Sequence, residues 1–424
     1  MRTVVHKFGG TSVRDSAGRR AAAAIVASAL AAGERVAVVV SAMGRRGDPY
    51  ATDTLLALAR AEGPAPVPAR DEDLLASCGE VVSAVVFAQS LRAAGVRDVV
   101  AMTGLQAGIL TDAHHGEARI LRVDPEPVRR VLDRGGVPVV TGFQGVTEDF
   151  EVTTLGRGGS DTTAAALGAA LEADEVAIFT DVEGIMTADP RIVPEARILS
   201  RIHYDETFEL AHLGARVLHP RAVEIARQAS VPLRVLSTFR PGPGTVVGPA
   251  QEGGIVDRWQ RRDRAETVVG VTARLGLANV DTRANARGPV TPRQVFGRLA
   301  EAGVSVDLMN VFPDRTSFVV REGDVAETER VLASLFGGRE AFTVRRGLAK
   351  VGVVGSAIHD FPGVMALFMD ALAQVEVEVL ATSDSHQSIT ALVEEGGVER
   401  ALRSLHSAFR LGGEVAGSAG REGA

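Results

Sequence analysis

Two kinds of hydrophobic segment alternate along the first 240 residues. Short runs rich in β-branched residues predict buried strands, and longer amphipathic stretches between them predict helices. The predicted strands are 36–40, 137–140 and 176–180, and the predicted helices are 16–32, 73–94 and 162–173. Strands that alternate with helices predict an α/β fold, in which a mainly parallel sheet is covered by helices on both faces. Such a sheet binds its ligand at the carboxyl ends of its strands.

The pattern changes at a Pro-Gly-rich stretch between residues 240 and 254, whose composition is typical of a domain boundary. After it, shorter elements follow in the order strand, helix, strand, strand, helix, and this order occurs twice. The two copies align on 306–308 and 377–379, and a helix-like run, 294–302 or 364–374, precedes each. The repeat predicts two compact βαββαβ units of about 70 residues each.

These changes of pattern divide the 424 residues into segments, in a chain long enough for two or three domains. The last dozen residues are rich in Gly, Ala and Glu, a composition typical of a flexible tail. We predict an α/β domain at 1–240, a linker at 241–264, two ferredoxin-like units at 265–340 and 347–410, and a tail at 411–424.

Composition narrows the class of protein. The formal net charge of −7 and the scarcity of aromatic residues argue against a nucleic-acid-binding surface and favour a small-molecule substrate. A single cysteine, Cys78, excludes an intramolecular disulfide and fits a reducing compartment. We find neither a signal-peptide pattern nor a run of about 18 uncharged apolar residues. The sequence therefore predicts a soluble, cytoplasmic protein that does not bind a membrane.

Lysine is rare in this chain, since only two of the 46 Lys and Arg residues are lysines. One of them, Lys7, lies in the apolar run 4–8 directly before Gly9 and Gly10. A lysine retained in so arginine-rich a chain indicates a task that arginine cannot perform, such as gripping phosphate as a compact, mobile point charge. The two glycines would let backbone N–H groups approach an anion. Gly-Gly alone, however, also fits an ordinary strand-to-helix turn.

A glycine-rich turn at 155–163 is the most specific run in the chain. It places Arg157, Asp161 and three hydroxyl side chains directly before an alanine-rich helix. Ser160 or Asp161 could simply cap that helix. Arg157 lies on a glycine-flanked backbone, where its guanidinium is suited to bind a substrate carboxylate.

A third run, 180–191, leaves a buried strand and turns twice. A connection of this length at the carboxyl end of a strand is typical of a nucleotide-binding loop. A plain connection between two elements has the same appearance, so this run taken alone leaves both interpretations open.

Read together, these runs closely resemble the aspartate kinases of the amino-acid kinase superfamily, which carry C-terminal tandem ACT domains. The runs that occur in that family's order are 7–13, 40–44, 142–146, 156–164, 180–185, 187–191 and 217–220. The resemblance covers the whole chain, because the family has its two ACT domains where the repeats lie here. It implies an amino-acid kinase fold followed by two ferredoxin-like ACT domains.

The resemblance also implies a reaction. It is the ATP-dependent phosphorylation of the β-carboxylate of L-aspartate to 4-phospho-L-aspartate, the first step toward lysine, diaminopimelate, threonine and methionine. Lys7 would hold the transferring phosphate, with Gly9 and Gly10 donating backbone N–H groups. Asp161 would be the second catalytic residue and would orient Lys7, because phosphoryl transfer depends on positioning and charge neutralisation. Mg²⁺ would bridge phosphate oxygens rather than lie in a cage of protein ligands.

Family resemblance assigns the aspartate pocket to five residues. Arg157 and Ser160 would bind the substrate carboxylates, and Glu80 would receive the ammonium group. Ser41 and Thr52 would complete the pocket, although the loop before Thr52 varies in length in the family. Without the resemblance, Glu80 reads as a solvated helix charge, since charged side chains are mostly exposed.

The same resemblance places the nucleotide. Thr180, Asp181, Asp189 and Arg191 would surround the adenosine and phosphates of ATP, although Arg191 alone reads as a surface arginine. Met186 stands where the family often has an aromatic residue beside the adenine. Arg216 stands where the family usually has a lysine that contacts the nucleotide, and we expect Arg216 to reach phosphate.

Regulation by an amino acid is implied by the ACT repeats, together with a homodimer or higher homo-oligomer. The turn that opens the first ACT helix, 285–289, departs from the usual Asp-Lys-Pro-Gly, whereas 360–363 keeps most of it. The stretches 47–53 and 382–386 resemble the diaminopimelate-sensitive Bacillus-type enzymes. The effector is left open among lysine, threonine and meso-diaminopimelate.

Two other functions compete with this interpretation. Another kinase of the superfamily would act on glutamate, carbamate or UMP, but those kinases lack the Ser-Asp-Thr-Thr run combined with paired ACT repeats. A catalytically silent amino-acid sensor would bind ligand through the repeats and regulate a partner. All the candidate catalytic residues are present, which counts against the sensor.

Overall fold

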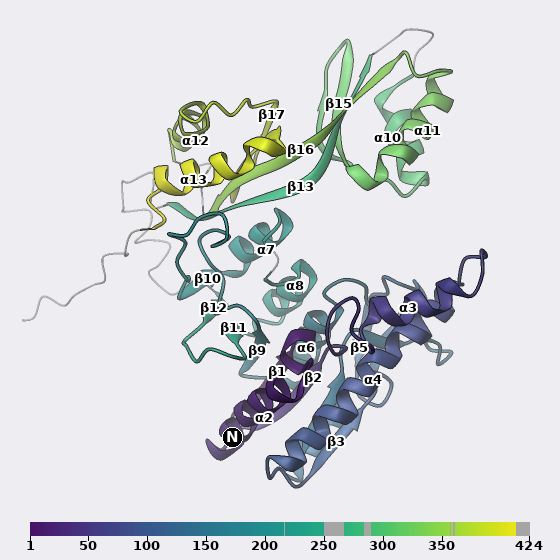
Figure 1. Ribbon diagram of the computed structural model, residues 1–424, viewed down its shortest axis with the longest axis vertical. Helices are drawn as coiled ribbons and strands as arrows, with labels where there is room; N and C mark the ends of the chain where they lie inside the picture. The colour runs from purple at the N-terminus through teal and green to yellow at the C-terminus, as the bar shows by residue number, and fades with distance from the viewer. Residues whose placement is uncertain (216, 250–266, 284–289, 357, 359–360, 413–424) are drawn as a thin grey trace, which may run out of the picture. The chain divides into compact units, whose positions relative to one another are not determined.

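The computed structural model describes residues 1–215, 217–249, 267–283, 290–356, 358 and 361–412 (Figure 1). The chain divides into two compact units. The N-terminal unit comprises Met1–Ile185, Ile198–Ala211 and Arg216–Gly254, and the C-terminal unit comprises Met186–Arg197, His212–Ala215 and Ile255–Ala424. Two short segments that precede residue 216 thus belong to the C-terminal unit.

In the described part of the N-terminal unit, eight strands form the main sheet in the order β10-β12-β11-β9-β1-β2-β6-β3. Their pairing is parallel except between β11 and β12. The strands are β1 (Thr3–Phe8), β2 (Arg35–Val40), β3 (Val99–Met102), β6 (Val137–Thr141), β9 (Glu175–Thr180), β10 (Arg201–His203), β11 (Leu233–Ser237) and β12 (Thr245–Gly248). β12 lies in the stretch for which the sequence predicts a linker, so the sheet continues beyond residue 240.

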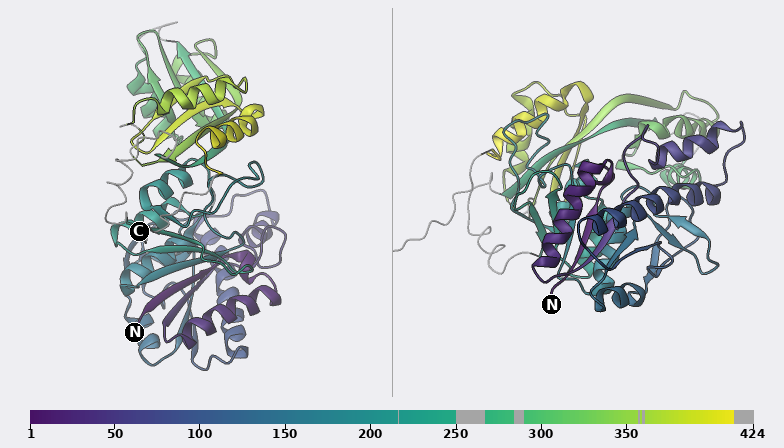
Figure 2. Two further views of the ribbon diagram at one scale, coloured as in Figure 1. Left: turned by 90° about the vertical axis from the view of Figure 1, so that its left-hand side faces the viewer. Right: turned by 60° about the horizontal axis from the view of Figure 1, so that its bottom comes forward.

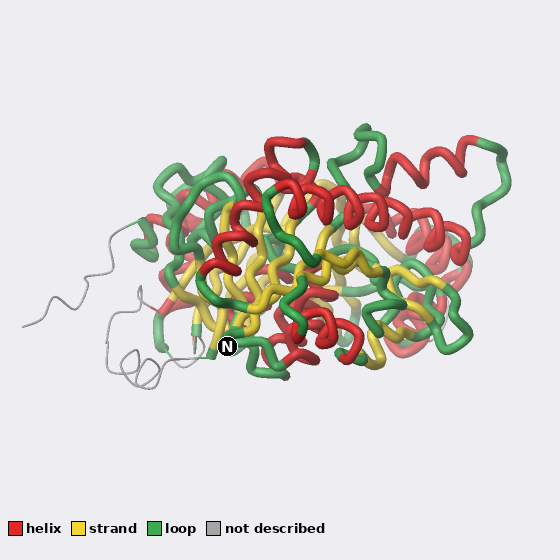
Figure 3. The backbone as a smooth tube through the Cα atoms, turned by 90° about the horizontal axis from the view of Figure 1, so that it is seen from below, coloured by secondary structure: helices red, strands yellow, loops and turns green. Residues whose placement is uncertain are grey.

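Helices cover both faces of this sheet, and Figures 2 and 3 show strands between helices. On one face, α2 (Ser16–Ala31) and α4 (Ala69–Ala93) share an apolar core with β1 and β2. On the other face, α6 (Gly159–Leu171) packs on β1 and β9 and against α8 (Pro220–Gln228), and α5 (Glu126–Asp133) bonds to α6 through the Arg129 guanidinium and the Ala170 carbonyl. The other helices described in this unit are α1 (Gly10–Val13), α3 (Thr52–Ala61) and α7 (Tyr204–His212). These layers confirm the predicted α/β fold.

Alternation along β1 decides where its polar side chains point. Val4 and Phe8 belong to the core under α2 and α4. Lys7, one residue out of phase with them, therefore points to the opposite face, which α6 covers. His6 shares the phase of the core, where its ring centroid lies 5.1 Å from that of Phe179. Burial lowers the pKa of His6 to about 4, so His6 is a neutral core residue.

A second, four-stranded sheet in the order β5-β4-β7-β8 packs beside α4. Its strands are β4 (Ile109–Thr111), β5 (Ile120–Val123), β7 (Gln144–Val146) and β8 (Val152–Thr154). α4 is long and apolar enough to cross a membrane, but half of its most apolar stretch is buried inside the structure. Its buried face also carries Asp73 and Glu80. These features identify α4 as a core helix.

The described part of the C-terminal unit is built on a six-stranded antiparallel sheet in the order β14-β15-β13-β16-β18-β17. Helices α10 and α11 cover one half of it, and α12 and α13 the other (Figure 1). The elements are β13 (Val268–Arg283), α10 (Pro292–Glu301), β14 (Asp307–Val311), β15 (Arg315–Arg321), α11 (Val325–Phe336), β16 (Phe342–Gly355), α12 (Val364–Ala373), β17 (Ala381–Asp384), β18 (Ser388–Glu394) and α13 (Val398–Ala408), with short 3-10 turns η2 (Glu322–Asp324) and η4 (Glu395–Gly397).

The two predicted βαββαβ units share this one sheet, because β13 and β16 each run through both halves. Register shifts interrupt their pairing near Leu277, where Gly276 and Gly347 have φ angles of +71° and +69°. Glycine at such a bulge lets a strand bend without ending. The repeat therefore marks two helix-covered halves of a continuous sheet.

Candidate active site

Three candidate residues lie at the carboxyl edge of the main sheet. Strands β9, β1 and β2 are parallel neighbours, and Phe8 is in register with both Val40 and Phe179. Lys7, Ser41 and Thr180 are therefore brought to the same edge, where a parallel sheet binds ligands. Ser41 donates its backbone N–H to the Phe8 carbonyl at 3.1 Å, which ties the start of its loop to β1.

Lys7 and Asp161 meet at this edge. The Lys7 Nζ lies 2.7 Å from Oδ1 of Asp161, an ion pair although its geometry is not that of a hydrogen bond. Both residues are only 9% exposed. α6 begins at Gly159, three residues before the predicted start, so Asp161 stands in its first turn. A carboxylate is favoured there by the helix dipole, and it holds the ammonium in a place from which water is largely excluded.

Gly9, the first of the two glycines after β1, was expected to donate its backbone N–H to phosphate, but the structure uses that N–H elsewhere. Gly9 donates its N–H to the Phe179 carbonyl at 3.1 Å, as part of the pairing between β1 and β9. The expectation that the Gly9 N–H binds phosphate is therefore corrected, because the sheet already uses that donor. Gly10 is required by packing, since a Cβ there would lie 2.6 Å from the Ala42 carbonyl oxygen. It lets the loop after β2 approach the loop after β1.

Glu80 is a buried carboxylate on α4, with 3% of its surface exposed. Its Oε1 accepts the Ala42 N–H at 3.1 Å, and within the described residues its Oε2 has no partner. Burial raises the pKa of Glu80 to about 8, and the hydrogen bond from Ala42 partly opposes this. The reading of Glu80 as a solvated charge is wrong. A buried oxygen without a donor is suited to receive a cation.

The turn at Gly156–Gly158 presents Arg157 to solvent. Gly156 and Gly158 have φ angles of +73° and +69°, in the left-handed region that favours glycine. A Cβ on Gly158 would also lie 2.2 Å from the Cγ atom of His219. Ser160, which follows in α6, is buried against Gly142, where a Cβ would come within 2.6 Å of the Ser160 Cβ. The turn thus has one conformation in which Arg157 is exposed and Ser160 is enclosed.

The other candidates are placed as follows. Thr52 is the half-buried first residue of α3, which packs along α4. Thr180 donates its hydroxyl to Oδ1 of Asp181 at 3.1 Å, and Oδ2 of Asp181 accepts from Arg45 at 2.7 Å in an exposed ion pair. Arg216 lies outside the described residues, as do the ACT turn 285–289 and part of 360–363.

Met186, Asp189 and Arg191 belong to the C-terminal unit. Arg191 is exposed and binds both carboxylate oxygens of Asp189, at 3.0 Å from Nε and 2.6 Å from a terminal nitrogen. This contact lowers the pKa of the Asp189 carboxyl. The segment that carries all three residues, 186–197, packs Ala188 and Val193 into the core of the unit.

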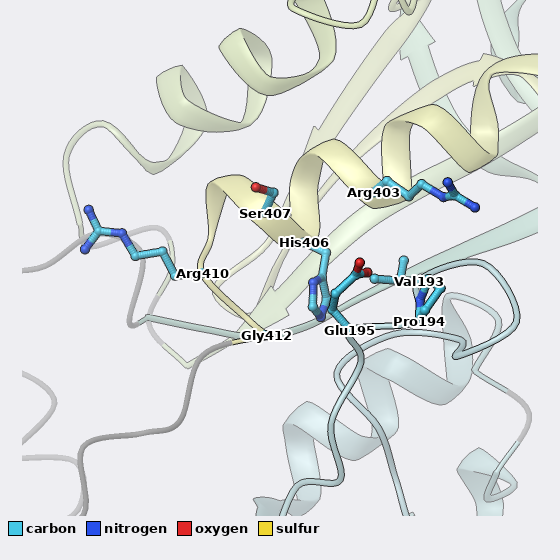
Figure 4. Close-up of a pocket in the computed structure, with 8 residues that line it drawn as sticks. All are labelled: Val193, Pro194, Glu195, Arg403, His406, Ser407, Arg410 and Gly412. Atoms are coloured by element: carbon cyan, nitrogen blue, oxygen red, sulfur yellow. The ribbon is translucent and has the colours of Figure 1, made fainter.

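A pocket of about 470 Å³ lies where this segment meets the end of α13 (Figure 4). Val193 and Glu195 line it from the segment, and His406 and Ser407 line it from α13. His406 is also bonded to the buried Thr187, with 3.0 Å between Nε2 and Oγ1. The segment is thus fixed to α13 by a side-chain hydrogen bond as well as by apolar packing.

Comparison with known proteins identifies the family. A model described as the amino acid kinase family matches residues 2–237, and one described as an ACT domain matches residues 351–409. Aspartokinase 1 of Bacillus subtilis is 44% identical to the chain over 418 residues, which cover 97% of this chain and 100% of that one. The chain belongs to the aspartokinase family. The predicted aspartate kinase, with its α/β fold and C-terminal ACT region, is thereby confirmed.

Solved structures agree with this assignment. Escherichia coli aspartokinase III in complex with aspartate and ADP is 26% identical, with a TM-score of 0.76, and the match covers 96% of this aspartokinase and 99% of that chain. The same E. coli enzyme in complex with lysine and aspartate matches with a TM-score of 0.73 at 26% identity over 96% of this aspartokinase and 100% of that chain.

Two features of this aspartokinase escaped the sequence analysis. His219 lies against Gly158, and the negative charge of Asp161 acts to raise its pKa, although burial lowers it overall. Its position in a His-Pro pair that opens α8 was the only available signal. Asp73 is buried on α4 and bonded to three residues far away in sequence. The sequence predicts a helix that starts at Asp73, and a residue at the end of a helix is expected to be exposed. The helix in fact begins at Ala69, so Asp73 lies inside it and is buried.

Proposed function

We propose that Lys7 and Asp161 form the phosphoryl-transfer centre, where the γ-phosphoryl group of ATP passes to the β-carboxylate of L-aspartate. The products are 4-phospho-L-aspartate and ADP. The observation that carries this proposal is the enclosed ion pair between Lys7 and Asp161 at the carboxyl edge of the sheet. Two side chains far apart in sequence meet at the position where an α/β sheet binds its ligand.

Phosphoryl transfer requires mainly that the protein position the reactants and neutralise the negative charge of the phosphoryl group. A phosphoryl group in transfer spreads negative charge over its oxygens, and the Lys7 ammonium neutralises part of it. Asp161 keeps that ammonium at the edge of the sheet before the reaction begins. The side chain of Lys7 is long and mobile enough to follow the phosphoryl group from ATP to the acceptor carboxylate.

The aspartate pocket combines one anionic and one cationic contact. Glu80 offers its unpartnered Oε2 to the substrate ammonium, which would restore the ionised state that burial disfavours. Arg157 offers an exposed guanidinium to a substrate carboxylate, and Ser160 adds a hydroxyl. Ser41 and Thr52 complete the pocket. Aspartate and glutamate carry the same charges, so the spacing of these contacts decides between them.

ATP is proposed to bind together with Mg²⁺. The site offers carboxylates, Asp161 and Asp181, which are the hard oxygen ligands that Mg²⁺ prefers. Within the described residues, no group of three or more His, Cys, Asp or Glu side chains could hold a metal by itself. Bound Mg²⁺ would neutralise phosphate charge. The further nucleotide-binding candidates are Gly10, Thr180, Met186, Asp189, Arg191 and Arg216. The N–H of Gly9 is already bonded to the Phe179 carbonyl.

The test is direct. Purified enzyme is incubated with ATP, Mg²⁺ and hydroxylamine, which traps an acyl phosphate as a hydroxamate. We expect turnover with L-aspartate and none with L-glutamate. Equal turnover of both amino acids, or ligand binding with no turnover of either, would overturn the proposed reaction. The second result would favour the silent sensor.

Feedback control is proposed to act through the C-terminal unit. The E. coli enzyme whose structure contains lysine and aspartate supports an amino-acid effector of this kind. The candidates are lysine, threonine and meso-diaminopimelate, and titration of activity with each would identify it. We further propose a cytoplasmic homodimer or higher homo-oligomer, whose mass sedimentation would measure. Inhibition by none of the three amino acids would contradict the proposed control.

A further inference from the structure

A buried carboxylate that the proposed chemistry does not use lies on α4. Asp73 is 2% exposed, and its two oxygens accept hydrogen bonds from three residues. The His115 ring contacts Oδ2 through Nδ1 at 2.8 Å, and the Gly116 N–H lies 3.0 Å from both oxygens. The Thr154 hydroxyl donates to Oδ1. An ionised carboxylate accepts only, so it satisfies all these donors at once.

These bonds join three parts of the N-terminal unit. Thr154 is the last residue of β8, and the Gly156–Gly158 turn with Arg157 begins after one further residue, Leu155. Gly116 lies beneath that turn, since a Cβ on Gly156 would be 3.0 Å from its carbonyl oxygen. Asp73 therefore holds the strand that leads into the Arg157 turn and the loop that supports this turn from below.

The same carboxylate also connects this turn to Glu80. Residues seven apart lie on one face of a helix after two turns, so Asp73 and Glu80 point from α4 in similar directions. Both are buried, and Gln144 bonds the helix between them by donating its side-chain NH₂ to the Ser77 carbonyl at 3.0 Å. The position of α4 relative to β8 thus sets the distance between the proposed ammonium and carboxylate contacts of the substrate.

We propose that Asp73 is a positioning residue for the amino-acid substrate, acting on Arg157 through Thr154 and Gly116 and on Glu80 through α4. This inference rests on the pocket proposed above. It assigns the hydrogen bonds of Asp73 a role in recognising a small amino acid with charged groups at both ends. Apart from Asp161, the proposed nucleotide-binding residues lie on other loops, so we expect ATP binding to depend much less on Asp73 than aspartate binding does.

Asp73→Asn in the full chain tests the inference. The amide keeps the shape but replaces one acceptor with a donor that faces the other donors. We expect the KM for aspartate to rise by about tenfold, because a lost bond to a charged group misplaces the pocket. We expect kcat to stay within about threefold and the KM for ATP to be unchanged, a division that loss of folded protein cannot produce.

Two matched variants complete the design. Asp71→Asn removes an exposed carboxylate from the same helix and should leave all constants at wild-type values. Thr154→Val removes the hydroxyl with little change of shape, and Thr154→Ser keeps it. Valine should raise the KM for aspartate and serine should restore it. This pair decides the question if Asp73→Asn does not fold.

Several results would overturn the inference. One is an unchanged KM for aspartate in both Asp73→Asn and Thr154→Val. Another is a rise in the KM for ATP as large as that for aspartate, which would indicate that Asp73 supports the fold of the whole N-terminal unit and not the aspartate pocket in particular. If the wild-type enzyme does not turn over aspartate, the proposed function fails and the inference fails with it. Wild-type turnover with an insensitive Asp73 removes the inference alone.

Discussion

Both lysines of the chain are buried and form ion pairs with aspartates, Lys7 with the buried Asp161 and Lys350 with the partly exposed Asp307. Lys350 is 5% exposed and lies in the sheet of the C-terminal unit. A guanidinium has five donors in a rigid plane, whereas an ammonium fits a narrow space and turns freely. Lysine therefore occurs in this chain at two buried positions, where the larger guanidinium of arginine would be harder to place. Lack of room alone is thus sufficient to retain a lysine, so the functional case for Lys7 depends on its position at the carboxyl edge of the main sheet beside Asp161.

Lys7→Arg keeps the charge but cannot follow the phosphoryl group in the same space. We expect kcat to fall by about 10²–10³-fold, the usual cost of losing one stabilising donor at a reacting group. Lys350→Arg is the matched control, since it changes a buried lysine outside the active site and should lower thermal stability without changing kcat. The hydroxamate assay measures the first effect. Near-normal turnover of Lys7→Arg would refute the role of its ammonium.

Glu80 gives the enzyme a predicted pH dependence. Burial raises its pKa to about 8, so in the free enzyme the carboxyl group is largely neutral below that pH. The substrate ammonium needs the ionised form, so binding below about pH 8 must first release a proton. We expect kcat/KM for aspartate to rise with pH and level off near pH 8, because this constant reports ionisations of the free enzyme.

Glu80→Gln is the control for that profile. It removes the titrating group, so it should raise the KM for aspartate and abolish the rise of kcat/KM with pH. A wild-type profile already flat between about pH 6 and pH 8 would contradict the assignment of Glu80 to the ammonium.

At the scale of the element, the Gly156–Gly158 turn depends on backbone conformation and on close approach together. Gly158→Ala must adopt φ near +69° and place a methyl group 2.2 Å from the His219 ring. Gly33→Ala is the matched control, because Gly33 has φ +83° with nothing within 4 Å of a Cβ. We expect Gly33→Ala to cost about 1 kcal/mol of unfolding free energy and Gly158→Ala about 2–4 kcal/mol. Denaturant titration measures both, and equal costs would show that the contact with His219 yields easily.

Elements that depend on local pattern were predictable, and those that depend on distant pairing were not. The β-branched run of β2 and the amphipathic stretch of α2 contain enough local information to place them. The start of α6 at Gly159 is fixed by contacts with Gly142 and Phe143, which no local window contains. In the same way β12 was hidden in a Pro-Gly-rich stretch, because its partners β10 and β11 lie earlier in the chain.

The residues of the candidate site likewise differ in whether the local sequence could indicate them. Lys7 was singled out by its residue type and its glycine turn, whereas the role of Asp161 was implied by the family resemblance. Asp73 was not, since its function depends on Thr154 and Gly116, which only the folded chain brings to it. Buried polar contacts between distant segments carry no periodic signal in the sequence.

At the scale of the whole molecule, the segment 186–197 places nucleotide-binding candidates in the C-terminal unit. Thr187 within it is fully hydrogen-bonded: its N–H donates to the Arg197 carbonyl, its carbonyl accepts from Val271, and its Oγ1 accepts from the Arg197 N–H. The Thr187 Oγ1 also lies 3.0 Å from Nε2 of His406, and this nitrogen accepts the hydroxyl proton when the ring is neutral and Nε2 carries no proton. Burial, the main cause, lowers the pKa of His406 and favours this neutral form.

His406 therefore makes stability depend on pH. The folded chain binds a proton at His406 less readily than the unfolded chain, so stability is full above the ordinary pKa of 6.5 and falls as pH is lowered through it toward the folded-state value. We expect His406→Gln to make this fall smaller, as seen in thermal unfolding between about pH 5 and pH 8, while the buried His6 and His219, whose pKa values burial also lowers, keep the remainder. His114→Gln, whose parent side chain is 87% exposed, should leave the slope unchanged. A wild-type slope in both variants would contradict the role of His406.

Removal of residues after Gly248 tests how far the nucleotide candidates depend on the C-terminal unit. The truncated chain keeps every strand of the main sheet, but the segment 186–197 loses Val271, His406 and the apolar core around Val193. Asp189 and Arg191 then lie on a segment without its support. We expect faster proteolytic cleavage within 186–197, a higher KM for ATP than for the full chain, and no response to an amino-acid effector. Cleavage and a KM for ATP equal to those of the full enzyme would mean that the segment holds its conformation alone, and effector control would then need another route to the nucleotide.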